Sequence, residues 1–84
     1  MQIQFVGIDP STDRNECPTV WVDKEEQRLL IQSYNADEAS KAQCEATSPA
    51  YGPVPPTETI ISIPARMVPA IRKAIDALEN PGLH

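Results

Sequence analysis

The sequence TVWVDKEEQRLLIQSY, from Thr19 to Tyr34, decides the fold of this chain. Its two ends, Thr19–Asp23 and Arg28–Tyr34, are rich in the β-branched and aromatic residues that favour strands. The polar residues Lys24–Gln27 separate these ends, and such an arrangement is typical of a β-hairpin. Because the polar stretch contains no glycine, we expect a four-residue loop around a type I turn.

A further strand is expected before the hairpin. Apolar and polar residues alternate at the start of Gln2–Ile8, which is the period-two pattern of a half-buried strand. Residues 9–18 (DPSTDRNECP) then form a loop, because they are rich in turn-forming residues. Asp9, Asp13 and Glu16 could hold a cation, but their spacing is not that of a calcium loop. We therefore expect neither a metal nor a cofactor.

A weak helix is predicted after the hairpin. Asn35 is expected to cap a helix over Ala36–Ala46, and Glu38 completes a pair that resembles a capping box. The face of this helix that would be buried is small: Ala39, Ala42, Gln43 and Ala46. Such a face allows close approach to a sheet but stabilises the contact little.

The rest of the chain predicts a connector, a fourth strand and a last helix. Residues 47–57 are rich in proline and form a stiff loop, and Thr57–Ile63 is the fourth strand. The last helix begins between Ala65 and Val68 and ends near Asn80, and residues 81–84 are a flexible tail. Its apolar stripe follows the helical period: Met67, Val68, Ile71, Ile75 and Leu78.

These elements follow the order β-β-β-α-β-α and predict an α+β fold. We expect a two-layer sandwich, in which a four-stranded, mainly antiparallel sheet carries both helices on one face. The 84 residues form a single small domain, since domains typically contain about 100–150 residues.

The charge and the hydropathy of the chain argue against nucleic acids and membranes as partners. Twelve acidic residues against seven Lys and Arg give a net charge of −5. Because nucleic-acid affinity comes largely from basic residues that neutralise phosphates, we expect no nucleic-acid partner. No apolar run approaches the ~18 residues of a membrane span, and the N-terminus lacks the pattern of a signal peptide. We therefore expect a cytoplasmic protein with no membrane contact.

The sequence contains no recognisable catalytic constellation. Two cysteines, Cys17 and Cys44, are too few for a disulfide scaffold or a zinc site, and they form no C-x-x-C motif. The one histidine is the last residue, His84, so no Cys–His pair is available as nucleophile and base. Glycine-rich phosphate loops and the common hydrolase motifs are also missing. We assign no catalytic residue and do not favour an enzyme.

Two groups of residues are candidates for binding a partner. Trp21 is the single tryptophan, and the favoured interpretation is that it lies in the core. In the alternative, the face of the strand that carries Trp21 is partly exposed and binds a partner, and Tyr34 extends this surface. The second group is Arg66, Arg72 and Lys73, which have no acidic residue between them. These residues form either a solvated helix face or a docking patch for an acidic partner.

Three stretches resemble a group of small, acidic, uncharacterised actinobacterial proteins of the streptomycete type. They are FVGIDP at residues 5–10, CPTVWVD at 17–23 together with LIQ at 30–32, and IPARMV at 63–68. The similarity spans most of the chain, and residues 47–57 match least. Proteins of this group are often encoded near helix-turn-helix regulators. The resemblance therefore implies a regulatory or accessory role beside a partner protein, and it carries no catalytic residues.

The favoured function is a non-enzymatic interaction module that binds another protein, with a regulator as the implied partner. The alternative is a domain that responds to a small molecule or metal, with residues 9–17 as the lip of its site. Oligomeric state stays open between monomer and homodimer, because a four-stranded sheet leaves two edges that could pair.

Overall fold

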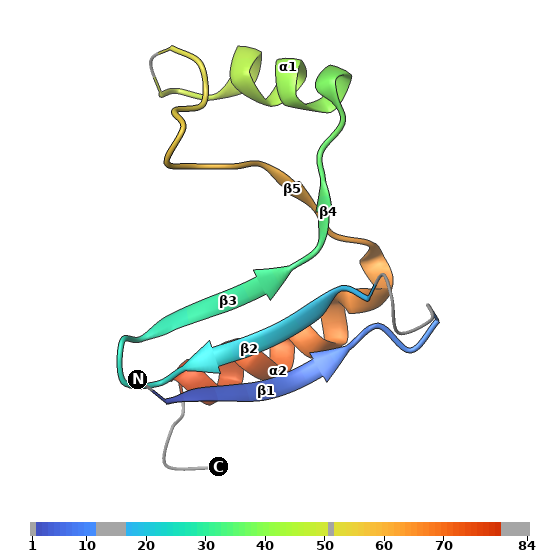
Figure 1. The fold of residues 1–84 in the computed structure, drawn as a ribbon, viewed down its shortest axis with the longest axis vertical. Coiled ribbons are helices and arrows are strands. Elements are labelled where there is room, and N and C mark those ends of the chain that lie inside the picture. Colours follow the sequence, from blue (N-terminus) through green and yellow to red (C-terminus); the bar gives the residue numbers. More distant parts are fainter. Residues whose placement is uncertain (1, 12–16, 51, 80–84) are drawn as a thin grey trace.

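The computed structural model describes residues 2–11, 17–50 and 52–79. Its central feature is a three-stranded antiparallel sheet in the order β1-β2-β3 (Figure 1). The strands are β1 (Ile3–Ile8), β2 (Thr19–Asp23) and β3 (Arg28–Gln32). The predicted hairpin is confirmed, since β2 and β3 pair without a register shift on either side of Lys24–Gln27.

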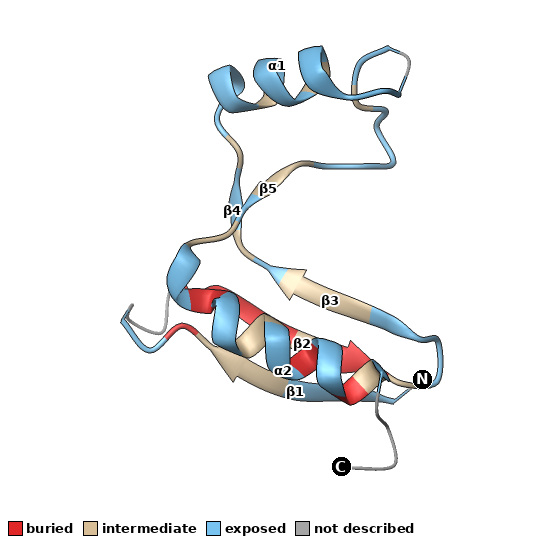
Figure 2. Cartoon of the chain, turned by 180° about the vertical axis from the view of Figure 1, so that it is seen from behind, coloured by how far each residue is buried: buried red, intermediate tan, exposed pale blue. Residues whose placement is uncertain are grey.

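One face of this sheet is covered by the end of the chain. A short 3₁₀ helix, η1 (Ala65–Met67), leads into α2 (Val68–Glu79), which begins within the predicted range. Helix α2 packs mainly on β1 and β2, and only its margin reaches β3 (Figures 1 and 2). The buried core lies between these elements: Val20, Val22, Met67, Ala74 and Ala77.

Residues 34–62 leave the sheet as an arm. Strands β4 (Tyr34–Asn35) and β5 (Ile61–Ser62) pair with each other and form its stem. Helix α1 (Glu38–Thr47) lies at its far end, on the side of the sheet bounded by β3 (Figure 1). No residue of α1 is buried.

The predicted four-stranded sheet with two helices on one face is not confirmed, although the fold is α+β. The fourth strand shortens to Ile61–Ser62 and pairs with β4 instead of joining the main sheet. The third strand stops at Gln32, and the chain changes direction between β3 and β4 (Figure 1). The sequence pattern gives strand propensity, but it does not give the direction in which a strand leaves its sheet.

The prediction for α1 also needs correction. Its N-cap is Asp37 rather than Asn35, and the Asp37 carboxylate accepts hydrogen bonds from the Ser40 amide (3.1 Å) and hydroxyl (2.7 Å). The small residues that were expected to face the sheet are exposed: Ala39, Ala42, Gln43 and Ala46. Such a face offers little apolar area, so burial does not hold the helix against the sheet.

Candidate protein-interaction surface

The face of the sheet that points away from α2 is covered by no element of the described chain. Strand residues alternate between faces, and Val20 and Val22 point toward α2. The register places Phe5, Trp21 and Leu30 side by side on the other face, one from each strand. We call these three residues the apolar row. Phe5 is 56% exposed, and its two neighbours are half-buried.

Asp23, a polar residue two positions from Trp21 on the same face, has its hydrogen-bond partners within the fold. Asp23 is buried and accepts hydrogen bonds from the Arg28 Nε and the Glu26 amide, each at 3.2 Å. Burial raises the pKa of Asp23, but these two donors outweigh it and hold the pKa below its usual value. Asp23 is therefore an ionised structural group that closes the hairpin, not a proton donor or acceptor for chemistry.

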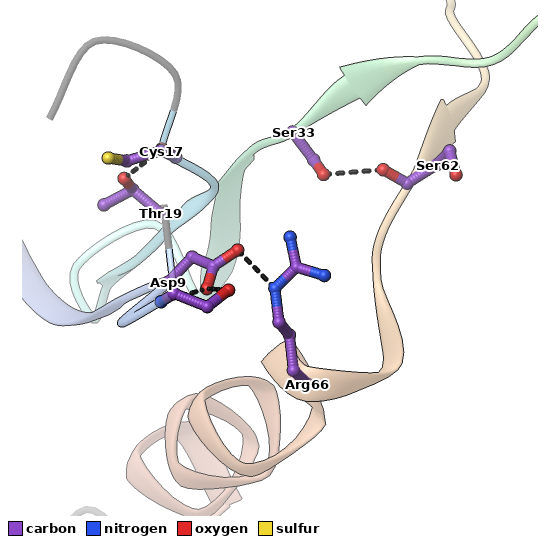
Figure 3. Close-up of polar contacts among 7 residues, drawn as sticks. Asp9, Cys17, Thr19, Ser33, Ser62 and Arg66 are labelled. Carbon is purple, nitrogen blue, oxygen red and sulfur yellow. Dashed lines mark hydrogen bonds and ion pairs between the residues drawn. The ribbon is translucent and has the colours of Figure 1, made fainter. Parts of the chain in front are cut away.

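A second buried carboxylate lies at the end of β1. Asp9 is 2% exposed, and its Oδ2 accepts a 2.7 Å hydrogen bond from the Arg66 Nε (Figure 3). Its Oδ1 accepts from the amide and the hydroxyl of Ser11, each at 2.9 Å. Burial raises the pKa of Asp9, but the Ser11 bonds and the Arg66 guanidinium lower it by more. The site fixes η1 to β1 and leaves neither carboxylate oxygen available for catalysis.

Polar contacts also fix the ends of β2 and β3. The carbonyl of Cys17 accepts hydrogen bonds from the Thr19 hydroxyl (2.8 Å) and from the Gln32 Nε2 (3.0 Å). The Ser33 hydroxyl donates to the Ser62 carbonyl at 2.6 Å, which ties the stem of the arm to the end of β3 (Figure 3). These contacts hold the ends of β2 and β3 together and connect them to the stem.

The structure places two of the three predicted basic residues, Arg66 and Lys73, at one hollow. Arg66 is committed to Asp9, although 45% of its side chain is exposed. Lys73 lines a hollow of about 330 Å³ beside β1, together with Arg66. Arg72 lies one residue earlier on α2, and the helical step of about 100° points it away from β1. The helix therefore spreads these charges, and a docking patch for an acidic partner gains no support from this arrangement.

The two predicted aromatic residues, Trp21 and Tyr34, lie in different sheets. Trp21 does not belong to the buried core; it is half-buried on the outer face. Tyr34 is 40% exposed in β4 and lines a hollow of about 180 Å³ with Pro18, Gln32 and Ser33. Gln32 pairs with Thr19 at the end of the outer face, so Tyr34 stands just beyond that face.

Sequence reasoning did not select Phe5, the most exposed member of the apolar row. Its alternation with polar neighbours indicates a strand with one buried face, but the pattern does not say which face a helix covers. The register supplies the missing information, because it aligns Phe5 with Trp21. Ile3, which is 46% exposed, follows the same alternation.

The expected lip of a ligand site falls partly outside the described residues, because Asp13 and Glu16 lie there. Among the residues that are described, no group of three His, Cys, Asp or Glu side chains could hold a metal ion. Within the same residues, no helix has the length and apolar character needed to cross a membrane.

Comparisons with family models, with curated proteins and with solved structures each return no significant match. The resemblance to small actinobacterial proteins therefore stays a prediction.

Proposed function

We propose that this chain is a non-enzymatic interaction module, which binds another protein through the outer face of its sheet. The observation that carries this proposal is the exposure of Phe5 beside Trp21 and Leu30. Contiguous apolar side chains on a solvent-facing surface are typical of protein-binding sites. Burying a side chain such as Phe5 against a partner contributes about 1.5–3 kcal/mol.

The charges support a protein partner over a nucleic acid. The net charge is −5, and Arg28, on the strand that carries Leu30, is paired with Asp23. Lys24 and Lys73 line a hollow with Phe5, but a chain with this net charge repels a phosphate backbone as a whole. A flat apolar row with aromatic members fits an apolar protein surface, and aromatic anchors often dominate such interfaces. The identification of this partner as a regulator rests on the sequence resemblance alone.

Affinity capture from native lysate, followed by mass spectrometry, tests the proposal. The tagged parent chain is compared with Phe5→Ser and with Val68→Ser, which removes a 42% exposed apolar side chain on α2 instead. We expect one protein near a one-to-one ratio with the parent and with Val68→Ser. Phe5→Ser should weaken its binding at least tenfold, the equivalent of about 1.4 kcal/mol.

Thermal unfolding separates this effect from a loss of structure. Because Phe5 lies outside the buried core, Phe5→Ser should melt close to the parent. Equal capture of the same protein by both variants would refute the outer face as the docking surface, as would capture of nothing by the parent.

A further inference from the structure

Strand β3 forms an open edge of the sheet. It pairs with β2 on one side, and no strand within the described residues pairs with its other side. Proteins usually protect such edges with proline, bulges or charges. The centre of β3 is instead Leu29-Leu30-Ile31, and its register with β2 is unbroken. The opposite edge, β1, does carry an irregularity, between Phe5 and Gly7.

The hydrophobic core is also open at this edge. Leu29 and Ile31 share the inner face with Val22 and Val20, and they pack on the core while staying half-exposed. Because α2 lies over β1 and β2, it covers them incompletely (Figure 2). On α2, Ile75 is 39% exposed and lies two residues after Lys73, so the helical period turns it away from β1.

We propose that a second copy of this chain binds along β3, so that the two β3 strands pair antiparallel about a two-fold axis at Leu30. The strand is self-complementary in this register. Leu29 lies opposite the partner's Ile31, and Arg28 lies opposite the partner's Gln32, so no like charges face each other. The result is a continuous six-stranded sheet, in which the apolar rows of both copies join on the outer face.

The surface area supports a second copy as the occupant. The chain exposes 6312 Å², whereas a compact protein of 9.2 kDa exposes about 4,900 Å². The excess of roughly 1,400 Å² includes the exposed arm, and it is larger than the ~800 Å² that each partner contributes to a stable interface. The radius of gyration is 14.7 Å, against about 12 Å for a compact chain of this length.

The position of the arm agrees with this arrangement. Helix α1 lies on the β3 side of the sheet, which is the side that the second copy would occupy (Figure 1). It buries no residue within its own chain. A helix of ten residues is marginal in water without a packing partner. The second copy would supply that partner.

Cysteine cross-linking tests the interface and its register. Cys44, which is exposed, and Cys17, whose carbonyl lies 3.0 Å from the Gln32 side chain, are first replaced by serine. In that background Leu30→Cys places two thiols opposite each other, with Cβ atoms about 4.5–5.5 Å apart. Gln32→Cys is the matched control, because the two positions 32 would be about 13 Å apart. With copper phenanthroline we expect Leu30→Cys to form a covalent dimer at least tenfold faster than Gln32→Cys.

Sedimentation equilibrium of the parent chain provides the second measurement. We expect twice the monomer mass of 9.2 kDa at micromolar concentrations, and the same mass for Phe5→Ser. Three results would overturn the proposal: a monomeric parent, equal cross-linking at both positions, or a dimer in which Leu30→Cys does not cross-link. The readout does not involve capture of another protein, so the two proposals fail independently.

Discussion

The contact between Asp9 and Arg66 joins two residues that lie 57 positions apart. The carboxylate is buried with three hydrogen bonds, two from Ser11 and one from Arg66. If Arg66 is lost, the buried carboxylate keeps its desolvation cost, and only the two Ser11 hydrogen bonds remain to offset it. The guanidinium of Arg66 is therefore a structural requirement at the junction of β1 and η1, and it is not available to a partner as a binding charge.

Replacing Arg66 by glutamine should lower the melting temperature by several degrees at pH 7, as measured by circular dichroism. The pKa of Asp9 is lowered in the fold, so its contribution is complete above the unfolded pKa and is lost as the pH falls through the folded pKa. The difference between Arg66→Gln and the parent should therefore shrink in acid. Arg72→Gln, at an exposed position, is the control and should melt like the parent. A difference that stays constant between pH 7 and pH 3 would contradict this assignment.

At the scale of elements, the contact between β1 and α2 depends on a missing side chain. A methyl group on Gly7 would lie 2.9 Å from the Cβ of Ala70, which is closer than real contacts allow. Gly7→Ala should therefore destabilise the fold by about 1–3 kcal/mol, because strand and helix must separate. Urea denaturation measures this cost.

The double variant Gly7→Ala with Ala70→Gly isolates the contact. Ala70→Gly alone should cost about 0.5–1 kcal/mol through helix propensity. If the clash is the cause, the double variant should be more stable than the sum of the two costs predicts. Strict additivity would show that the methyl group of Ala70 is not what limits position 7.

Sequence patterns predicted the elements that short-range chemistry controls. The hairpin at Thr19–Gln32 and the start of the last helix follow from strand propensity, a polar loop and a proline in the first turn. The position of α1 could not be predicted from the sequence. It depends on whether burying its small apolar face is favourable enough to bring the helix back to the sheet after the chain turns away between β3 and β4. The pairing of Asp9 with Arg66 could not be predicted either, because no local pattern links residues so far apart in the sequence.

At the scale of the whole molecule, the buried core belongs to the sheet and the C-terminal helices, and the described part of the arm contributes nothing to it. Every residue of the buried core cluster lies in β2, η1 or α2. The residues packed around that cluster also lie outside positions 34–62. The arm is therefore held in position by the contacts of its stem. There the Ala36 amide donates a hydrogen bond to the Ile60 carbonyl at 3.2 Å.

This division predicts that the arm can be shortened without unfolding the protein. Residues 37–59 are replaced by Asn-Gly, which suits a two-residue turn between paired strands, here from Ala36 to Ile60. We expect a cooperative transition within a few degrees of the parent, because no core contact is removed. Self-association should weaken at least tenfold if α1 lies along the second copy, as measured by sedimentation. Loss of cooperative unfolding would instead show that the arm stabilises its own chain, and then the open face of α1 would need an explanation within the monomer.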